Sequence, residues 1–154
     1  MKELKIIKYF FLTGLSCCML FLFSFPALAQ EKTLTVISNS KGAPDQMNLA
    51  ELTAVLKGEK QRWSNTVPVV IALMKSSTET GLSTSKKIYH MSSDEFNKYW
   101  LALVFQGKAK APVFFNSPAE LESFVAETPG AIGVIESSTS GKVRQVIVEG
   151  KKSF

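Results

Sequence analysis

The stretch YWLALVFQGKAKAPVFFNSPAELESFVAETPGAIGVIE, residues 99–136, carries the strongest fold signals in the chain. It opens inside a predicted helix. Phe96, Trp100 and Leu103 recur with the 3.6-residue period of a helix that presses one face onto a core. Gly107 stands where this apolar pattern stops, and glycine commonly follows the end of a helix.

A second helix and a buried strand follow within the same stretch. Ser117-Pro118 places a serine at the N-cap and a proline at the first helical position, where a missing amide is tolerated. Residues 128–130 form a Thr-Pro-Gly turn, and the short apolar run at residues 131–135 predicts a buried strand. Two helices packed against a buried strand indicate an α/β fold.

The remaining chain continues this alternation of strands and helices. Strands are expected at residues 33–38, 67–73 and 143–148, and helices after Asn48, through residues 86–89 and after Ser92. Residues 149–154 are expected to be a frayed tail. The element order predicts a mainly parallel sheet flanked by helices.

The amino end has the pattern of a secretory signal peptide. Lysines precede an apolar run at residues 9–25, and Ala27-Leu28-Ala29 supplies the small residues of a cleavage site. We expect residues 1–29 to be removed and residues 30–154 to form one periplasmic or secreted domain, which meets a membrane only through the signal peptide before cleavage. The alternative is an uncleaved membrane anchor, since the apolar run approaches the length that spans a bilayer.

Composition argues against several classes of function. Without residues 1–29 the chain has 15 basic and 12 acidic residues, a net charge of +3, and no clustered basic stripe of the kind that binds nucleic acid. Both cysteines lie in the removed segment, and His90 is the only histidine. We therefore expect no metal site, no cofactor, no nucleic-acid partner and no enzymatic activity.

A polar loop after the strand at residues 67–73 is the best candidate for a ligand site. The carboxyl ends of strands in open α/β sheets are where ligands bind, and a helix starting there offers free amides to an anion. The candidate ligand residues are Lys75, Ser76, Ser77, Thr78 and Thr80, with Ser38 and Asn39 expected on the same rim. In the alternative interpretation, Ser76 and Glu79 form a helix cap, and Glu79 would place a negative charge beside the anion.

Several motifs resemble the substrate-binding proteins of phosphate ABC transporters. They are Tyr99-Trp100, Phe105-Gln106-Gly107, Ala111-Pro112, Thr128-Pro129-Gly130-Ala131-Ile132-Gly133, and the run at residues 52–59 followed by Trp63. This resemblance implies one lobe of a type II periplasmic-binding-protein fold, whose full-length members close two lobes over phosphate. Ser76-Ser77-Thr78 corresponds to the family's Ser-Gly-Thr, without its glycine, and no arginine matches the family's phosphate arginine.

The resemblance implies an exported solute-binding-like protein. It would bind phosphate or a related oxyanion and act as a transport or sensing accessory, with a transporter or envelope protein as partner. The alternative is a non-catalytic envelope interaction module that has kept the fold and lost anion binding. A single wall leaves much of the anion in water, so we expect phosphate binding by the monomer to be weak or absent.

Overall fold

The computed structural model describes residues 33–136 and 141–154, which fall in the unit Lys32–Phe154. The strands are β1 (Thr35–Ser38), β2 (Gln46–Met47), β3 (Val70–Met74), β4 (Val113–Phe115), β5 (Ala131–Ile135) and β6 (Arg144–Val148). The helices are α2 (Leu49–Leu56), α3 (Glu79–Thr84), the π-helix η1 (Ser85–Tyr89), α4 (Ser93–Phe105) and α5 (Pro118–Glu127). The predicted signal peptide and the boundary at residue 30 lie outside the described residues.

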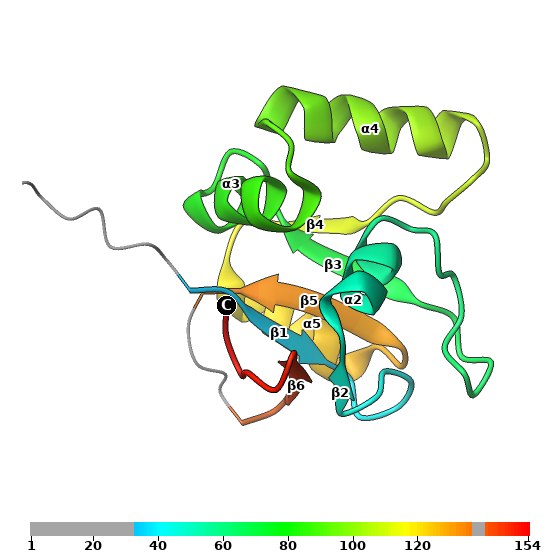
Figure 1. Ribbon diagram of the computed structural model, residues 1–154, viewed down its shortest axis with the longest axis vertical. Helices are drawn as coiled ribbons and strands as arrows, with labels where there is room; N and C mark the ends of the chain where they lie inside the picture. The colour runs from blue at the N-terminus through cyan, green and yellow to red at the C-terminus, as the bar shows by residue number, and fades with distance from the viewer. Residues whose placement is uncertain (1–32, 137–140) are drawn as a thin grey trace, which may run out of the picture. The chain divides into compact units, whose positions relative to one another are not determined.

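The strands form one six-stranded sheet in the order β2-β6-β1-β5-β3-β4 (Figure 1). The pairs β2–β6, β3–β4 and β3–β5 are parallel. Strand β1 runs antiparallel to both of its neighbours, β5 and β6. The predicted α/β fold with a mainly parallel sheet is therefore confirmed, with β1 as the reversed strand.

The central strands β1, β3 and β5 send alternate side chains into two cores, one on each face of the sheet. Along β3, Ile71 and Leu73 join the core that contains α2, η1 and α4, whereas Ala72 and Met74 join the core that contains α5. All five residues of β5 are buried, as its continuous apolar sequence predicts for a strand covered on both faces. Among the described residues, no helix is long and apolar enough to cross a membrane.

Three predicted helix starts are confirmed in detail. The side chains of Asn48, Ser92 and Ser117 each accept a hydrogen bond from the backbone amide three residues later, which satisfies a donor that the helix itself leaves open. At Ser92 the capping box is complete, because the Glu95 carboxylate also accepts from the Ser92 amide at 2.8 Å. The Ser92 backbone and hydroxyl hold the pKa of Glu95 below its ordinary value.

The edge strands β2 and β4 and the carboxyl-terminal tail differ from expectation. Strand β4 was not predicted, and it pairs with β3 at the outer edge of the sheet. The expected frayed tail is wrong: the Leu34 amide donates to the Phe154 carbonyl at 2.7 Å, and the Phe154 amide donates back to Leu34 at 3.0 Å. These two bonds tie the tail to the residue that precedes β1, and the Phe154 side chain packs against the core.

Candidate functional site

The loop at residues 75–78 joins the carboxyl end of β3 to α3, as the sequence predicts for the ligand loop. The Lys75 amide donates to the Phe115 carbonyl at 2.9 Å, which continues the pairing of β3 with β4 for one more residue. The Thr78 amide then donates to the Lys75 carbonyl at 2.9 Å, and this bond closes a tight turn. The loop is therefore anchored to the sheet at its first residue.

Thr78, rather than Ser76, is the N-cap of α3. Its hydroxyl donates to the Lys75 carbonyl at 2.7 Å and accepts from the Gly81 amide at 3.1 Å. The predicted alternative, a cap formed by Ser76 with Glu79, is therefore wrong, because Glu79 is the first residue of the helix. The single proton of the Thr78 hydroxyl is already donated within the loop, so Thr78 shapes the site rather than donating to an anion.

Gly81 allows α3 to approach the loop closely. A Cβ atom at this position would lie 2.0 Å from the Lys75 carbonyl oxygen and 2.8 Å from that of Met74. Real Cβ atoms do not come so near to backbone, so only glycine fits.

The other predicted ligand residues differ in what they can offer. The Lys75 and Ser77 side chains are exposed, whereas Thr80 is 6% exposed and lies within the first turn of α3. The Ser76 hydroxyl donates to Asn97 Oδ1 at 3.2 Å, on the neighbouring helix α4. Free donors are therefore the Lys75 ammonium, the Ser77 hydroxyl, and the amides of Ser76 and Ser77, which have no acceptor among the described residues.

The start of α5 lies beside this loop, and sequence reasoning missed it. Because Met74 pairs with Phe115, Asn116 and the N-cap Ser117 emerge at the same sheet edge as Lys75. Pro118 has no amide proton, and the Glu120 amide donates to Ser117 Oγ. The Ala119 amide is therefore the first-turn donor of α5 that lacks an intrahelical acceptor and is open to an anion. Predicting β4 would have placed the start of α5 beside the loop. Its three residues are too few to show the alternating pattern by which a strand is recognised in a sequence.

Ser38 and Asn39 do not lie on the same rim as Lys75. Ser38 pairs with Ile132 at the beginning of β5, and Val70 at the beginning of β3 pairs with Ala131. The end of antiparallel β1 therefore meets the amino end of β3, at the opposite edge of the sheet from Lys75. The expectation of a shared rim is wrong because it assumed that β1 and β3 were parallel.

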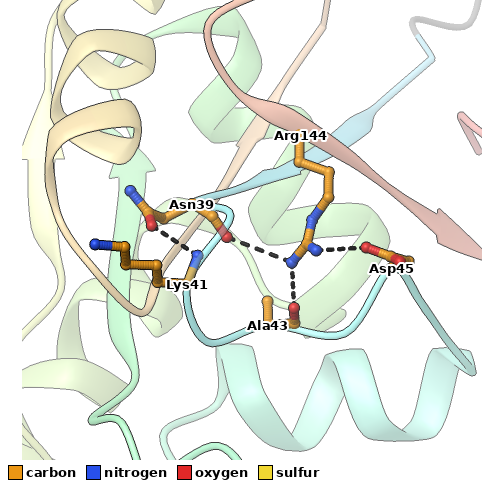
Figure 2. Close-up of polar contacts among 5 residues, drawn as sticks. All are labelled: Asn39, Lys41, Ala43, Asp45 and Arg144. Atoms are coloured by element: carbon orange, nitrogen blue, oxygen red, sulfur yellow. Dashed lines mark hydrogen bonds and ion pairs between the residues drawn. The ribbon is translucent and has the colours of Figure 1, made fainter.

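Asn39 instead holds a loop in place (Figure 2). Its side-chain amide donates to the carbonyls of Val125 and Ala126 at 3.0 and 2.8 Å, at the end of α5, and its Oδ1 accepts from the Lys41 amide at 2.9 Å. Figure 2 shows the Arg144 guanidinium reaching the carbonyls of Asn39 and Ala43 and the Asp45 carboxylate. Both the amide nitrogen and the amide oxygen of the Asn39 side chain are therefore used in bonds that hold the protein together.

Two further residues considered from the sequence are also accounted for. Trp63 is 3% exposed, and its indole N–H donates to the Gly130 carbonyl at 2.9 Å, so it anchors the Thr-Pro-Gly turn. His90 is exposed, with φ of 56° at the end of η1. Within residues 33–136 and 141–154, no group of three His, Cys, Asp or Glu side chains is placed to hold a metal ion.

Comparison with known proteins finds solved structures with a similar fold. No protein-family model matches the sequence, and no curated protein gives a significant match. The fold is similar to that of an ABC-type phosphate transport receptor from Vibrio cholerae, with a TM-score of 0.61 and 16% identity over 77% of this chain and 46% of that one. The chain has the fold of a single periplasmic-binding-protein lobe.

Two other solved structures have a similar fold. One, from Clostridium perfringens, is assigned to the phosphate ABC transporter substrate-binding proteins and contains bound phosphate; its TM-score is 0.59 at 15% identity over 78% of this chain and 46% of that one. The other, PstS from Borrelia burgdorferi, has a TM-score of 0.55 at 17% identity over 78% and 48%. The chain thus spans about half the length of these proteins.

Proposed function

We propose that this chain is an exported solute-binding-like protein that takes inorganic phosphate or a related oxyanion at the loop of residues 75–80. In this role it serves transport or sensing together with a transporter or envelope protein. The observation that carries the proposal is the convergence at one sheet edge of the Lys75 ammonium, the open amides of Ser76 and Ser77, and the Ala119 amide in the first turn of α5. The likeness of the fold to phosphate-binding proteins supports it.

The same geometry limits the expected affinity. The described residues form one wall, so a bound anion keeps part of its hydration, and exposed charges contribute only about 0 to 1 kcal/mol each. Glu79 adds a carboxylate in the first turn of α3. We therefore expect a phosphate dissociation constant well above the micromolar range.

Thermal unfolding of residues 30–154 with phosphate or sulfate tests the proposal. At a ligand concentration ten times the dissociation constant, binding to the native state alone stabilises by about 1.4 kcal/mol. Lys75→Ala is expected to remove the rise in Tm, whereas Lys86→Ala, which removes an exposed lysine from η1, is a matched control and should keep it. Titration calorimetry gives the constant directly, and a submicromolar value would contradict the one-walled account.

The second candidate is an interaction module that does not bind anions. It is favoured by the carboxyl end of α4, where Leu101 is 70% and Phe105 is 89% exposed although both are large and apolar. If neither anion raises Tm and Phe105→Ser abolishes co-purification with an envelope protein, this function replaces the first. An anion-dependent rise in Tm that Lys75→Ala removes would count against it.

A further inference from the structure

A cavity of about 330 Å³ opens at the opposite edge of the sheet from the Lys75 loop. Its walls are the segment Lys60–Arg62 with Pro68 on one side and the segment Ala109–Ala111 on the other. Its apolar lining, called the floor below, consists of Val69, which precedes β3, Ile71 of β3 and Val113 of β4. The volume falls within the range of pockets that hold small molecules.

The cavity exists because β3 and β4 separate toward their amino ends. Strand β3 is already paired with β5 at Val70, whereas its pairing with β4 begins only at Ala72, opposite Val113. The two chains therefore diverge and leave a gap between them. Nothing in this arrangement depends on the proposed function of the Lys75 loop.

Both walls are held in place, so the cavity is formed before any ligand arrives. The Gln61 side-chain amide donates to the Lys108 carbonyl at 2.6 Å, which links one wall to the other. Gly58, at φ of 77°, packs so closely that an added Cβ would lie 2.9 Å from the Ala109 Cβ. A preformed pocket spares a ligand the entropic cost of ordering the chain.

Three basic residues and no acidic residue line the cavity. Lys60 is compensated, since its ammonium contacts Glu51 Oε1 at 2.7 Å. Arg62 uses one guanidinium nitrogen on the Thr66 carbonyl and keeps the rest of its fork exposed. Within the described ranges the Lys110 ammonium has no hydrogen-bond or ion-pair partner. The cavity therefore has two uncompensated cations above an apolar floor.

We propose that this cavity binds a small organic carboxylate with a short apolar body. The planar Arg62 guanidinium matches the geometry of a carboxylate, Lys110 adds a second charge, and the valine and isoleucine floor takes the apolar part. The site is separate from the Lys75 loop, because the length of β3 puts about 13 Å between its two ends. Inorganic phosphate, which lacks an apolar body, should prefer the other edge.

Amide NMR shifts of the isotope-labelled domain distinguish the two edges. Benzoate is expected to cause saturable shifts at Gln61, Arg62 and residues 109–113, whereas benzyl alcohol, its neutral analogue, should need about fivefold higher concentration to cause the same shifts. Phosphate shifts, if they occur, are expected at residues 76–80. Absence of saturable benzoate shifts at the cavity up to about 10 mM, a concentration at which even millimolar binding is nearly saturated, overturns the proposal. Equal binding of benzyl alcohol overturns the role assigned to the cations.

The variant carrying Arg62→Gln and Lys110→Gln tests those cations directly. Loss of two exposed charge contacts is expected to weaken benzoate binding about fivefold. The control is Lys86→Gln, which removes an exposed charge from η1 and should leave the affinity unchanged. Both variants keep long polar side chains at the surface, and their amide spectra report whether the fold is intact. If the amide spectrum of the double variant is native and its benzoate affinity is unchanged, the proposal is contradicted.

Discussion

Replacing Gly81 with alanine is expected to disturb the loop at residues 75–78 more than any other change of a single methyl group. The new Cβ would lie 2.0 Å from the Lys75 carbonyl oxygen, 2.5 Å from its carbonyl carbon and 2.8 Å from the Met74 oxygen. All three are backbone atoms, so no side chain can rotate away. Restoring ordinary contact, at about 3.4 Å, requires either α3 or the loop to move by more than an ångström.

Two opposing terms set the size of the effect. Overpacking of this kind costs about 1 to 3 kcal/mol, whereas alanine favours a helix over glycine by about 1 kcal/mol. We expect Gly81→Ala to lower the free energy of unfolding by up to about 2 kcal/mol, and Tm by up to about 8 °C for a domain of this size. The Lys75 carbonyl also accepts from Thr78, so the turn that presents Lys75 and Ser77 should shift as well.

Urea unfolding followed by circular dichroism measures the stability, and amide shifts at residues 75–80 report the loop. Ser83→Ala is the control, because it introduces alanine in the same helix at a half-buried position. It should be neutral or slightly stabilising, since alanine is the better helix former. If Gly81→Ala unfolds at the same urea concentration as the wild type with unchanged loop shifts, the close approach of α3 is not what shapes the site.

Two further predictions concern buried aromatic residues. Tyr89→Phe leaves the Leu56 carbonyl without its donor and should cost about 1 to 3 kcal/mol in urea unfolding at neutral pH. Burial raises the pKa of Tyr89 well above its usual value near 10, so the unfolded chain ionises first. Wild-type stability should therefore fall above pH 10 by up to about 1.4 kcal/mol per pH unit, and Tyr89→Phe should reduce that slope; an equal slope in both proteins contradicts it. Trp63→Phe removes the donor to Gly130 and should cost about 1 to 3 kcal/mol by the same assay, whereas an unchanged midpoint would mean that this bond does not anchor the turn.

Local signals were read correctly from the sequence because they depend on neighbouring residues. Asn48, Ser92 and Ser117 each cap the helix that follows, and each needs only a partner three residues away. The start of α3 was harder, because Ser76 and Thr78 are both acceptable caps. Thr78 prevails because its hydroxyl also closes the turn back to Lys75, which the sequence does not display.

The pairing of strands that are distant in the sequence could not be predicted in the same way. Strand β4 has three residues, and its place at the sheet edge depends on its partner β3 rather than on its own pattern. The direction of β1 was the more important unknown, since it decides which loops share an edge of the sheet. Reversing that one strand moves Asn39 away from Lys75, and its amide bonds to the end of α5 instead.

The two edges of the sheet impose different requirements on a ligand. At the carboxyl edge, the Lys75 loop offers polar donors on one wall, so an anion there needs a second wall before most of its oxygens are satisfied. If a second copy of the chain supplies that wall, phosphate affinity should rise with protein concentration, because binding then requires association. If a different protein supplies it, affinity should be independent of protein concentration and increase only when that partner is added. The cavity at the amino edge has both of its walls within the described residues, so carboxylate binding there should be independent of concentration in either case.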